Sequence, residues 1–267
     1  MDFVEQYGPW GLIIGGSEGT GAAFARQLAE RGLNLALVAR SPGPLAGLAD
    51  ELRSSFPDRQ VRTLSADLST QAGAEAVQAT FGDLDVGLLI YNAGACSQWK
   101  HFLDADIDFA VRLTLLNSVN MMRVAHDFGR PMKSRGHGGI LVVGSGAMMT
   151  GLGGLATYSA SKAFSSLFSE GLWHELRPFG VHVLGYIVGQ TNTPAMARYF
   201  PGAIAAGADP REVAMFGLAN LANGPTVYAA GVEERMRTVQ HLSRKEAVEL
   251  RMGNTAAFNA EKADQTP

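Results

Sequence analysis

Short apolar segments alternate with longer helix-like segments along most of this chain. The apolar segments lie at 11–16, 34–40, 60–67, 85–94, 139–145, 181–188 and 225–230. The helix-like segments lie near 19–31, 44–55, 71–80, 106–130 and 156–177. Several apolar segments are apolar throughout, as expected of strands that are covered on both faces. The alternation therefore predicts an α/β fold with a doubly wound parallel sheet and helices on both faces.

The chain shows neither an internal repeat nor a linker that would divide it into two domains. Because 267 residues suit one α/β domain, we expect a single domain over 1–252. Within it we expect a substrate lid at 190–225, which is rich in Ala, Gly and Asn, and a C-terminal helix at 231–252. The mixed charges of that helix favour a solvated or subunit-facing position over membrane contact. Residues 253–267 are expected to form a flexible tail.

Composition and charge argue against several classes of partner. The net charge of −3 differs from the basic excess of a nucleic-acid surface. No apolar run reaches the ~18 residues of a membrane-spanning helix. Asp2 and Glu5 precede the first apolar run, unlike the start of a secretory signal. The single cysteine, Cys96, argues against a disulfide and a Cys/His metal site. We therefore expect a cytoplasmic protein with no metal, nucleic-acid or membrane partner.

A glycine-rich stretch, GGSEGTGAAF, joins the first apolar segment to the first helix-like segment. Its glycines permit a tight turn and a close approach of the backbone to a pyrophosphate, while the helix start supplies free N–H groups. An ordinary tight turn in a chain with 32 glycines is the alternative explanation. Because this is the first strand–helix turn, where such folds bind dinucleotides, Gly15, Gly19 and Gly21 predict a dinucleotide site.

The stretch TYSASKAF places Tyr158 four residues before Lys162 on an expected helix, so the two side chains share a face. Alone, this spacing also arises by chance. Ser145 ends the apolar segment GILVVGS and adds a hydroxyl at the same edge of the sheet. Because a nearby ammonium lowers the pKa of a phenol, we expect Lys162 to lower the pKa of Tyr158. Tyr158 would then act as acid and base in hydride transfer, and Ser145 would hold the substrate oxygen.

Together these motifs resemble those of the classical short-chain dehydrogenase/reductase family, over roughly residues 8–230. The resemblance implies a Rossmann-like fold and a nicotinamide-dependent oxidoreductase. It gives the catalytic positions to Asn117, Ser145, Tyr158 and Lys162, with Asn120 as a second candidate for the helix asparagine. The residues expected to bind the cofactor are Gly15, Ser17, Glu18, Gly19, Thr20, Gly21, Arg40, Ser41, Asp67, Leu68, Asn92, Ala93, Gly94, Tyr158, Lys162, Gly189, Thr191 and Thr193.

Several of these assignments come from the family's loop motifs. The resemblance implies that Asp67 lies on the adenine side, that Asn92 opens an Asn-Ala-Gly turn, and that Thr193 binds the nicotinamide. The chain departs from the family after the sixth strand, where Val188 takes the place of the usual proline before Gly189.

Two residues give opposite indications of cofactor choice. An enzyme that uses NAD usually ends its second strand with an acid, but here Ala39 holds that position and Arg40 and Ser41 follow. A guanidinium there can bind the 2′-phosphate of NADP in bidentate fashion. Glu18, in the glycine loop, would oppose that phosphate. We expect Arg40 to dominate because a direct charge-assisted contact outweighs screened repulsion from an exposed carboxylate, so NADP(H) is favoured over NAD(H).

The leading interpretation is an NADP(H)-dependent oxidoreductase acting on a carbonyl or secondary alcohol of a mostly apolar small molecule. The alternative is a dinucleotide-binding regulatory or scaffold protein of the same fold, against which the complete serine, tyrosine and lysine set argues. The side chains expected to form an apolar substrate wall are Trp99, Met148, Met149, Leu152, Met196, Tyr199, Phe200, Ile204, Met215 and Phe216.

The resemblance also implies a homodimer or homotetramer. In the family, the helices that match 106–130 and 156–177 pair across a two-fold axis. Their apolar side chains here are Val111, Leu115, Val119, Met122, Phe164, Leu167, Phe168 and Leu172.

Overall fold

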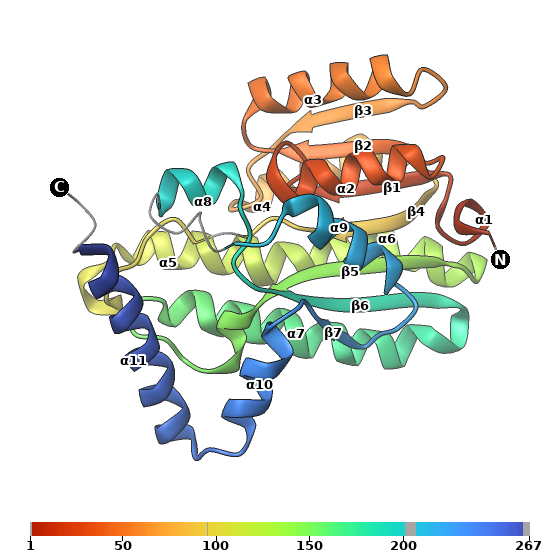
Figure 1. Cartoon of the computed structure of the whole chain (residues 1–267). Helices are drawn as coiled ribbons and strands as arrows, with labels where there is room; N and C mark the ends of the chain where they lie inside the picture. Colours follow the sequence, from red (N-terminus) through yellow and green to blue (C-terminus); the bar gives the residue numbers. More distant parts are fainter. Residues whose placement is uncertain (1, 95, 201–206, 264–267) are drawn as a thin grey trace.

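The computed structural model describes residues 2–94, 96–200 and 207–263, with only the backbone described for 254–263. Seven parallel strands form one sheet in the order β3-β2-β1-β4-β5-β6-β7 (Figure 1). The strands are β1 Trp10–Ile14, β2 Asn34–Ala39, β3 Val61–Ser65, β4 Val86–Tyr91, β5 Gly138–Ser145, β6 Val181–Val188 and β7 Thr226–Tyr228. All seven match apolar segments of the sequence, and the predicted doubly wound, Rossmann-like α/β fold is confirmed.

Helices cover both faces of the sheet (Figure 1). They are α1 Phe3–Tyr7, α2 Gly19–Glu30, α3 Pro42–Ser55, α4 Gln71–Phe81, α5 Ile107–Thr114, α6 Asn120–Arg135, α7 Ala156–Leu176, α8 Pro194–Tyr199, α9 Pro210–Ala219, α10 Val232–Gln240 and α11 Arg244–Ala263. One apolar core joins α2, α3 and α9 to the sheet, and a second joins α4, α6 and α7 to its other face. No helix of the described residues has the length and apolarity needed to cross a membrane.

The strand order places the crevice of the sheet beside β1 and β4. The chain leaves β1 toward β2 on one side and later returns to β4 on the other, so the loops after these two strands diverge. Ligands of doubly wound folds bind at this switch point, outside the carboxyl ends of the strands. The glycine loop follows β1, and Asn92 follows β4, so both lie at this point.

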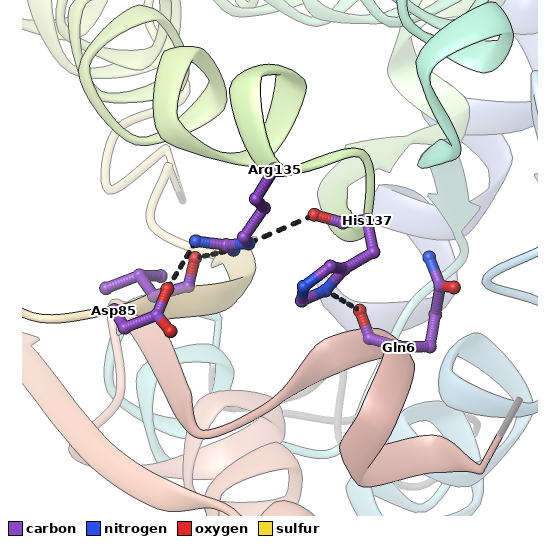
Figure 2. Close-up of polar contacts among 5 residues, drawn as sticks. Gln6, Asp85, Arg135 and His137 are labelled. Carbon is purple, nitrogen blue, oxygen red and sulfur yellow. Dashed lines mark hydrogen bonds and ion pairs between the residues drawn. The ribbon is translucent and has the colours of Figure 1, made fainter.

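At the amino ends of the strands, a polar cluster ties α1 to the sheet (Figure 2). The guanidinium of Arg135 binds the carboxylate of Asp85 and donates to the carbonyl oxygen of His137 at 3.2 Å. The Nδ1 atom of His137 lies 3.3 Å from the carbonyl oxygen of Gln6. The Gln6 amide itself donates to the carbonyl oxygen of Gly138, where β5 begins. This cluster therefore stabilises the edge of the sheet opposite the crevice.

The C-terminal region differs from the single helix expected over 231–252. Two helices, α10 and α11, form a hairpin, because Ser243 starts a new helix: its hydroxyl accepts from the N–H of Glu246 and the Glu246 carboxylate accepts from the N–H of Ser243. The sequence S-R-K-E carries this capping-box signal, which the helix prediction overlooked. Helix α11 continues to Ala263, past the expected start of the flexible tail, and 264–267 lie outside the described residues.

The segment expected to be a lid, 190–225, contains two helices, α8 and α9. Its second half contains α9, whose Val213, Ala214 and Leu218 are buried in the core shared with α2. The Gln27 side chain of α2 also donates to the carbonyl oxygen of Arg211 at 3.0 Å. Helix α9 therefore belongs to one of the helix layers of the sheet, and the lid over 190–225 stays a prediction.

Candidate active site

The glycine loop is folded so tightly that side chains would not fit at two of its positions. Gly15 has a φ of +84°, and an added Cβ would lie 2.8 Å from the backbone nitrogen of Ala93. A Cβ at Gly21 would lie 1.9 Å from the carbonyl oxygen of Gly15. The start of α2 therefore packs directly on the loop, as the close approach of a backbone to a pyrophosphate requires.

The turn after β4 braces this loop. The side-chain amide of Asn92 donates to the carbonyl oxygen of Gly15, and the N–H of Ala93 donates to that of Ile14, both at 2.9 Å. The Glu18 side chain precedes α2 without capping it, so the first-turn N–H groups of α2 remain available as donors. The loop, the turn and the helix start fit the phosphates of a dinucleotide.

Ser145 and Tyr158 meet at the carboxyl end of β5. Ser145 is the last residue of β5 and pairs in register with Val188 of β6. Its hydroxyl oxygen accepts from the N–H of Ala147 at 3.2 Å. A hydrogen bond with the Ser145 side chain favours the ionised form of Tyr158, while burial of the phenol disfavours it. The Ser145 hydroxyl, at the end of β5, and the Tyr158 hydroxyl, on the first turn of α7, are therefore neighbours.

The electrostatic expectation for Tyr158 is wrong in this structure. Burial raises the pKa of Tyr158, and this effect exceeds the opposing hydrogen bond with Ser145. The Nζ atom of Lys162 lies 5.8 Å from the centre of the Tyr158 ring and donates to the carbonyl oxygen of Val143 at 3.1 Å. Burial also lowers the pKa of Lys162 to about 8. The i,i+4 spacing makes the two side chains neighbours, but Lys162 does not offset the desolvation of the phenol.

Asn117 and Lys162 converge on Gly94. Asn117 lies in a π-helical turn, Leu115–Val119, between α5 and α6, and its amide donates to the Ser161 hydroxyl at 3.0 Å. An added Cβ at Gly94 would lie 2.0 Å from the Asn117 Oδ1 and 3.0 Å from the Lys162 Nζ. The Asn117 Oδ1 is buried and accepts no hydrogen bond from the described residues. This arrangement leaves a buried acceptor next to the ammonium.

Asn120, the second candidate, lies elsewhere. Its amide donates to the carbonyl oxygens of Leu68 and Thr70, each at 2.8 Å. It therefore fixes the loop between β3 and α4. The structure brings Asn117, and not Asn120, to Lys162.

The residues expected on the adenosine side lie at the ends of β2 and β3. Arg40 is exposed directly after β2, and its carbonyl oxygen accepts from the Ser65 hydroxyl at 3.1 Å. Ser41 precedes α3, and its side chain makes no capping hydrogen bond. The Asp67 carboxylate accepts from the N–H and the hydroxyl of Ser69, at 2.9 and 2.8 Å. Asp67 therefore fixes its own loop, while Arg40 remains available to an anion.

The loop after β6 returns to the glycine loop. An added Cβ at Gly19 would lie 2.8 Å from the Thr193 methyl, so the two loops are in contact. Thr191 is buried, and its hydroxyl donates to the carbonyl oxygen of Gly189 at 3.3 Å. One turn into α8, Arg198 forms an ion pair with Glu18. The sequence analysis did not single out Arg198, because only the tertiary fold brings it to the glycine loop.

The geometry agrees with a comparison of the sequence with protein families. The family model described as short chain dehydrogenase matches residues 10–203. The chain belongs to the short-chain dehydrogenase family. The family resemblance of the sequence is therefore confirmed.

Individual relatives of this short-chain dehydrogenase include steroid and fatty-acyl enzymes. The chain is 30% identical over 256 residues to a 7beta-hydroxysteroid dehydrogenase of Clostridium sardiniense, covering 93% of this chain and 96% of the relative. It is 36% identical over 187 residues to a very-long-chain 3-oxoacyl-CoA reductase of Aspergillus terreus, covering 66% of this chain and 51% of the relative. The match thus spans about half of the fungal reductase.

Solved structures of short-chain dehydrogenases have the same fold as this chain. A structure from a study of 7beta-hydroxysteroid dehydrogenase stereoselectivity has a TM-score of 0.87 and 26% identity, covering 95% of this short-chain dehydrogenase and all of the other chain. A short-chain dehydrogenase from Sphingobium yanoikuyae in complex with NADPH has a TM-score of 0.78 and 29% identity, covering 93% and 95% of the two chains.

The side chains expected to form an apolar substrate wall in this short-chain dehydrogenase differ in their burial. Trp99 packs against Gly154, beside a cavity of about 30 Å³ that Tyr158 also lines. Met149 and Leu152 are buried, whereas Met215 and Phe216 are exposed on α9. The Phe216 ring also lies 6.0 Å from that of the buried Tyr186, and a contact of Met215 and Phe216 with substrate stays a prediction. Met148, Met196, Tyr199 and Phe200 are partly buried, and Ile204 lies outside the described residues.

The C-terminal hairpin is the main structural neighbour that the sequence analysis missed. Three contacts join α11 to the loop that follows Ser145. They are donation from Arg244 to the Met149 carbonyl oxygen at 3.1 Å, from Arg251 to the Gly146 carbonyl oxygen at 3.2 Å, and from the Gly153 N–H to the Met252 sulfur at 3.1 Å. A small apolar core that includes Val232 and Ala247 supports them. The hairpin therefore holds the loop next to Ser145.

Proposed function

We propose that this protein is an NADP(H)-dependent oxidoreductase that interconverts a carbonyl and a secondary alcohol on a mostly apolar small molecule. The observation that carries the proposal is the meeting of Ser145 and Tyr158 at the end of β5, one helical turn from Lys162. A scaffold protein of this fold has no use for an acid/base group, a hydroxyl donor and a buried ammonium in one place.

Each residue of the set has a role that its surroundings support. Tyr158 donates its phenolic proton to the substrate oxygen in reduction and accepts it in oxidation. Ser145 donates a hydrogen bond to that oxygen and positions it. Lys162 lies near enough to replenish the phenolic proton through a relay, and its lowered pKa, about 8, suits proton exchange near neutrality. The unused acceptor of Asn117 can hold a water beside the ammonium as the next member of the relay.

The nicotinamide cofactor, when bound, supplies or accepts the hydride. The first turn of α2 and the glycine loop would hold its phosphates, and Asn92 would keep the loop in place. Arg40 would bind a 2′-phosphate, which supports NADP(H) over NAD(H). The NADPH complex of the Sphingobium relative is consistent with this choice.

An apolar substrate is supported by the residues around Tyr158 and by the relatives. The cavity beside Tyr158, about 30 Å³, is too small for such a substrate, but its walls include Phe102, Phe109, Leu113 and Leu155 next to the polar Gln98 and Lys100. Relatives are named for bulky lipophilic ketones and alcohols, namely steroids and very-long-chain 3-oxoacyl groups. We therefore propose that bulky apolar carbonyls are better substrates than small polar ones.

The test is NADPH oxidation, followed by absorbance, against a panel of carbonyls from small polar aldehydes to bulky cyclic ketones. We expect turnover, with higher kcat/KM for the bulky apolar members. Binding of NADPH without turnover on a broad panel would favour a regulatory or scaffold protein. A higher kcat/KM for small polar carbonyls would contradict the substrate class alone.

We further propose that the protein forms a homodimer or homotetramer through α5 and α7. Both helices carry exposed apolar side chains, among them Val111 on α5 and Leu167 on α7. The cytoplasmic location stays a prediction from the sequence.

A further inference from the structure

The ion pair between Glu18 and Arg198 joins two segments that are 180 residues apart in the chain. Both oxygens of the Glu18 carboxylate contact the guanidinium: Nη1 donates to Oε2 at 3.1 Å, and Nη2 donates to Oε1. The side chain of Arg198 is 54% exposed and that of Glu18 is 29% exposed. The guanidinium is therefore held in place and still open to a ligand on its outer side.

The pair lies where a 2′-phosphate would bind. Glu18 immediately precedes α2, and the N–H groups of Gly15 and Gly16 donate to the carbonyl oxygen of Val38, near the end of β2. Arg40 follows two residues after Val38. In dinucleotide-binding folds, the ribose of the adenosine lies between the glycine loop and the end of this second strand. The loop and Arg40 thus approach that ribose from two sides.

An unpaired Glu18 would oppose a phosphate at this place, and Arg198 removes that opposition. The charge of the carboxylate is balanced by the guanidinium that it binds. An arginine has five N–H donors, and those used on Glu18 and on the Tyr199 side chain do not exhaust them, so donors remain for another anion. Planar guanidinium groups bind phosphate and carboxylate with the same fork geometry.

We propose that Arg198 is a specificity-determining residue that supplies, from α8, the positive charge needed on the glycine-loop side of the 2′-phosphate. Glu18 serves as its anchor rather than as a barrier to NADP(H). The contact of Thr193 with Gly19 holds the start of α8 against the loop and thereby keeps Arg198 within reach of Glu18. This inference rests on the proposed use of NADP(H), but it concerns a residue that the family resemblance does not assign.

The consequence is a cofactor-selective effect of Arg198→Gln. The substitution removes the donors and leaves Glu18 as an uncompensated negative charge beside the phosphate. We expect the Kd for NADPH to rise roughly ten-fold or more, the loss typical of a hydrogen bond to a charged group, and the Kd for NADH to change less than about two-fold. The double variant Glu18→Gln/Arg198→Gln should recover part of the NADPH affinity, because the repulsion is gone.

The experiment measures binding by the full chain, without relying on turnover. NADPH and NADH are titrated by nucleotide fluorescence, and 2′,5′-ADP and 5′-AMP are titrated by calorimetry as probes that differ in the 2′-phosphate. The matched control is Arg26→Gln, which breaks the other exposed bidentate pair of α2, that of Arg26 with Glu51, at side-chain exposures of 48% and 46%. This control also leaves a carboxylate without its partner, but away from the expected ribose.

The outcomes separate this inference from the proposed function. A selective loss of NADPH and 2′,5′-ADP affinity in Arg198→Gln, with none in Arg26→Gln, supports it. A wild type that prefers NADPH together with an unchanged NADPH/NADH ratio in Arg198→Gln overturns the role of Arg198 alone. A wild type that binds NADH more tightly than NADPH overturns both this inference and the proposed cofactor.

Discussion

The Nζ atom of Lys162 lies 5.8 Å from the centre of the Tyr158 ring, and its hydrogen bond goes to the Val143 carbonyl oxygen. The ammonium is therefore tied to the end of β5 and not to the phenol. Lys162 is buried and Tyr158 partly so, and desolvation disfavours the charged form of each: the pKa of Tyr158 is raised and that of Lys162 is lowered. The two groups are thus held with the phenol protonated, which is the form that reduction of a carbonyl requires.

Removing the phenolic hydroxyl tests the acid/base role. Tyr158→Phe keeps the ring and its packing, so we expect kcat to fall by the ~10²–10⁴ of a lost general acid, with little change in the Kd for NADPH. Steady-state kinetics and nucleotide fluorescence measure the two quantities. Thr157→Ser, one residue earlier on α7, is the matched control and should keep near-normal kcat. Near-normal turnover in Tyr158→Phe would contradict the proposed acid/base role of Tyr158.

The buried ammonium predicts a pH-dependent stability. The pKa of Lys162 is about 8 in the folded protein, against a usual value of 10.5, so between these pH values the unfolded state binds more protons than the folded state. Stability therefore rises with pH through this window. Relative to Lys162→Met, which has no proton to lose, the wild type should gain about 2 to 3 kcal/mol between pH 7 and pH 10.

The measurement is urea unfolding of both proteins at several pH values. The difference between the two proteins cancels the other groups that titrate in the same window. It also cancels the constant cost of leaving the Val143 carbonyl oxygen without its donor in the variant. A difference that stays flat with pH would mean that Lys162 keeps its usual pKa in the folded protein.

Local sequence patterns predicted the sheet and most of the candidate site, whereas contacts between segments far apart in the chain could not be predicted. The apolar segments located all seven strands, and the first strand–helix turn located Gly15 and Gly21. The i,i+4 spacing correctly placed Lys162 beside Tyr158, but no spacing reveals how deeply the pair is buried, and burial decides the pKa of both. The ion pair of Glu18 with Arg198 depends on the path of the chain after β6, which periodicity does not encode.

The outer faces of α5 and α7 predict self-association. Exposed apolar side chains on these helices are Ile107, Val111, Phe164 and Leu167, with exposures of 61%, 50%, 36% and 68%. An interface that covers them would remove apolar surface from water.

We expect a dimer or tetramer by light scattering at micromolar concentration, and Leu167→Glu should shift it toward the monomer. Leu103→Glu, at an exposed leucine of the loop before α5, is the control and should leave the mass unchanged. A monomeric wild type would refute the prediction.

Cofactor choice gives the last prediction, and it turns on Arg40. Arg40 is exposed directly after β2, so Arg40→Ala should not disturb the fold. Loss of a charge-assisted contact of ~1.5–3 kcal/mol should reduce kcat/KM for NADPH by roughly ten-fold or more, with little effect on NADH.

Arg59→Ala is a suitable control, because Arg59 lies between α3 and β3 and donates to the Gly32 carbonyl oxygen. The quantity to compare is the NADPH/NADH ratio of kcat/KM in wild type and both variants. Because the Glu18 carboxylate is paired with Arg198, it should not mask the effect of Arg40. A ratio that Arg40→Ala leaves unchanged would show that the 2′-phosphate is bound elsewhere.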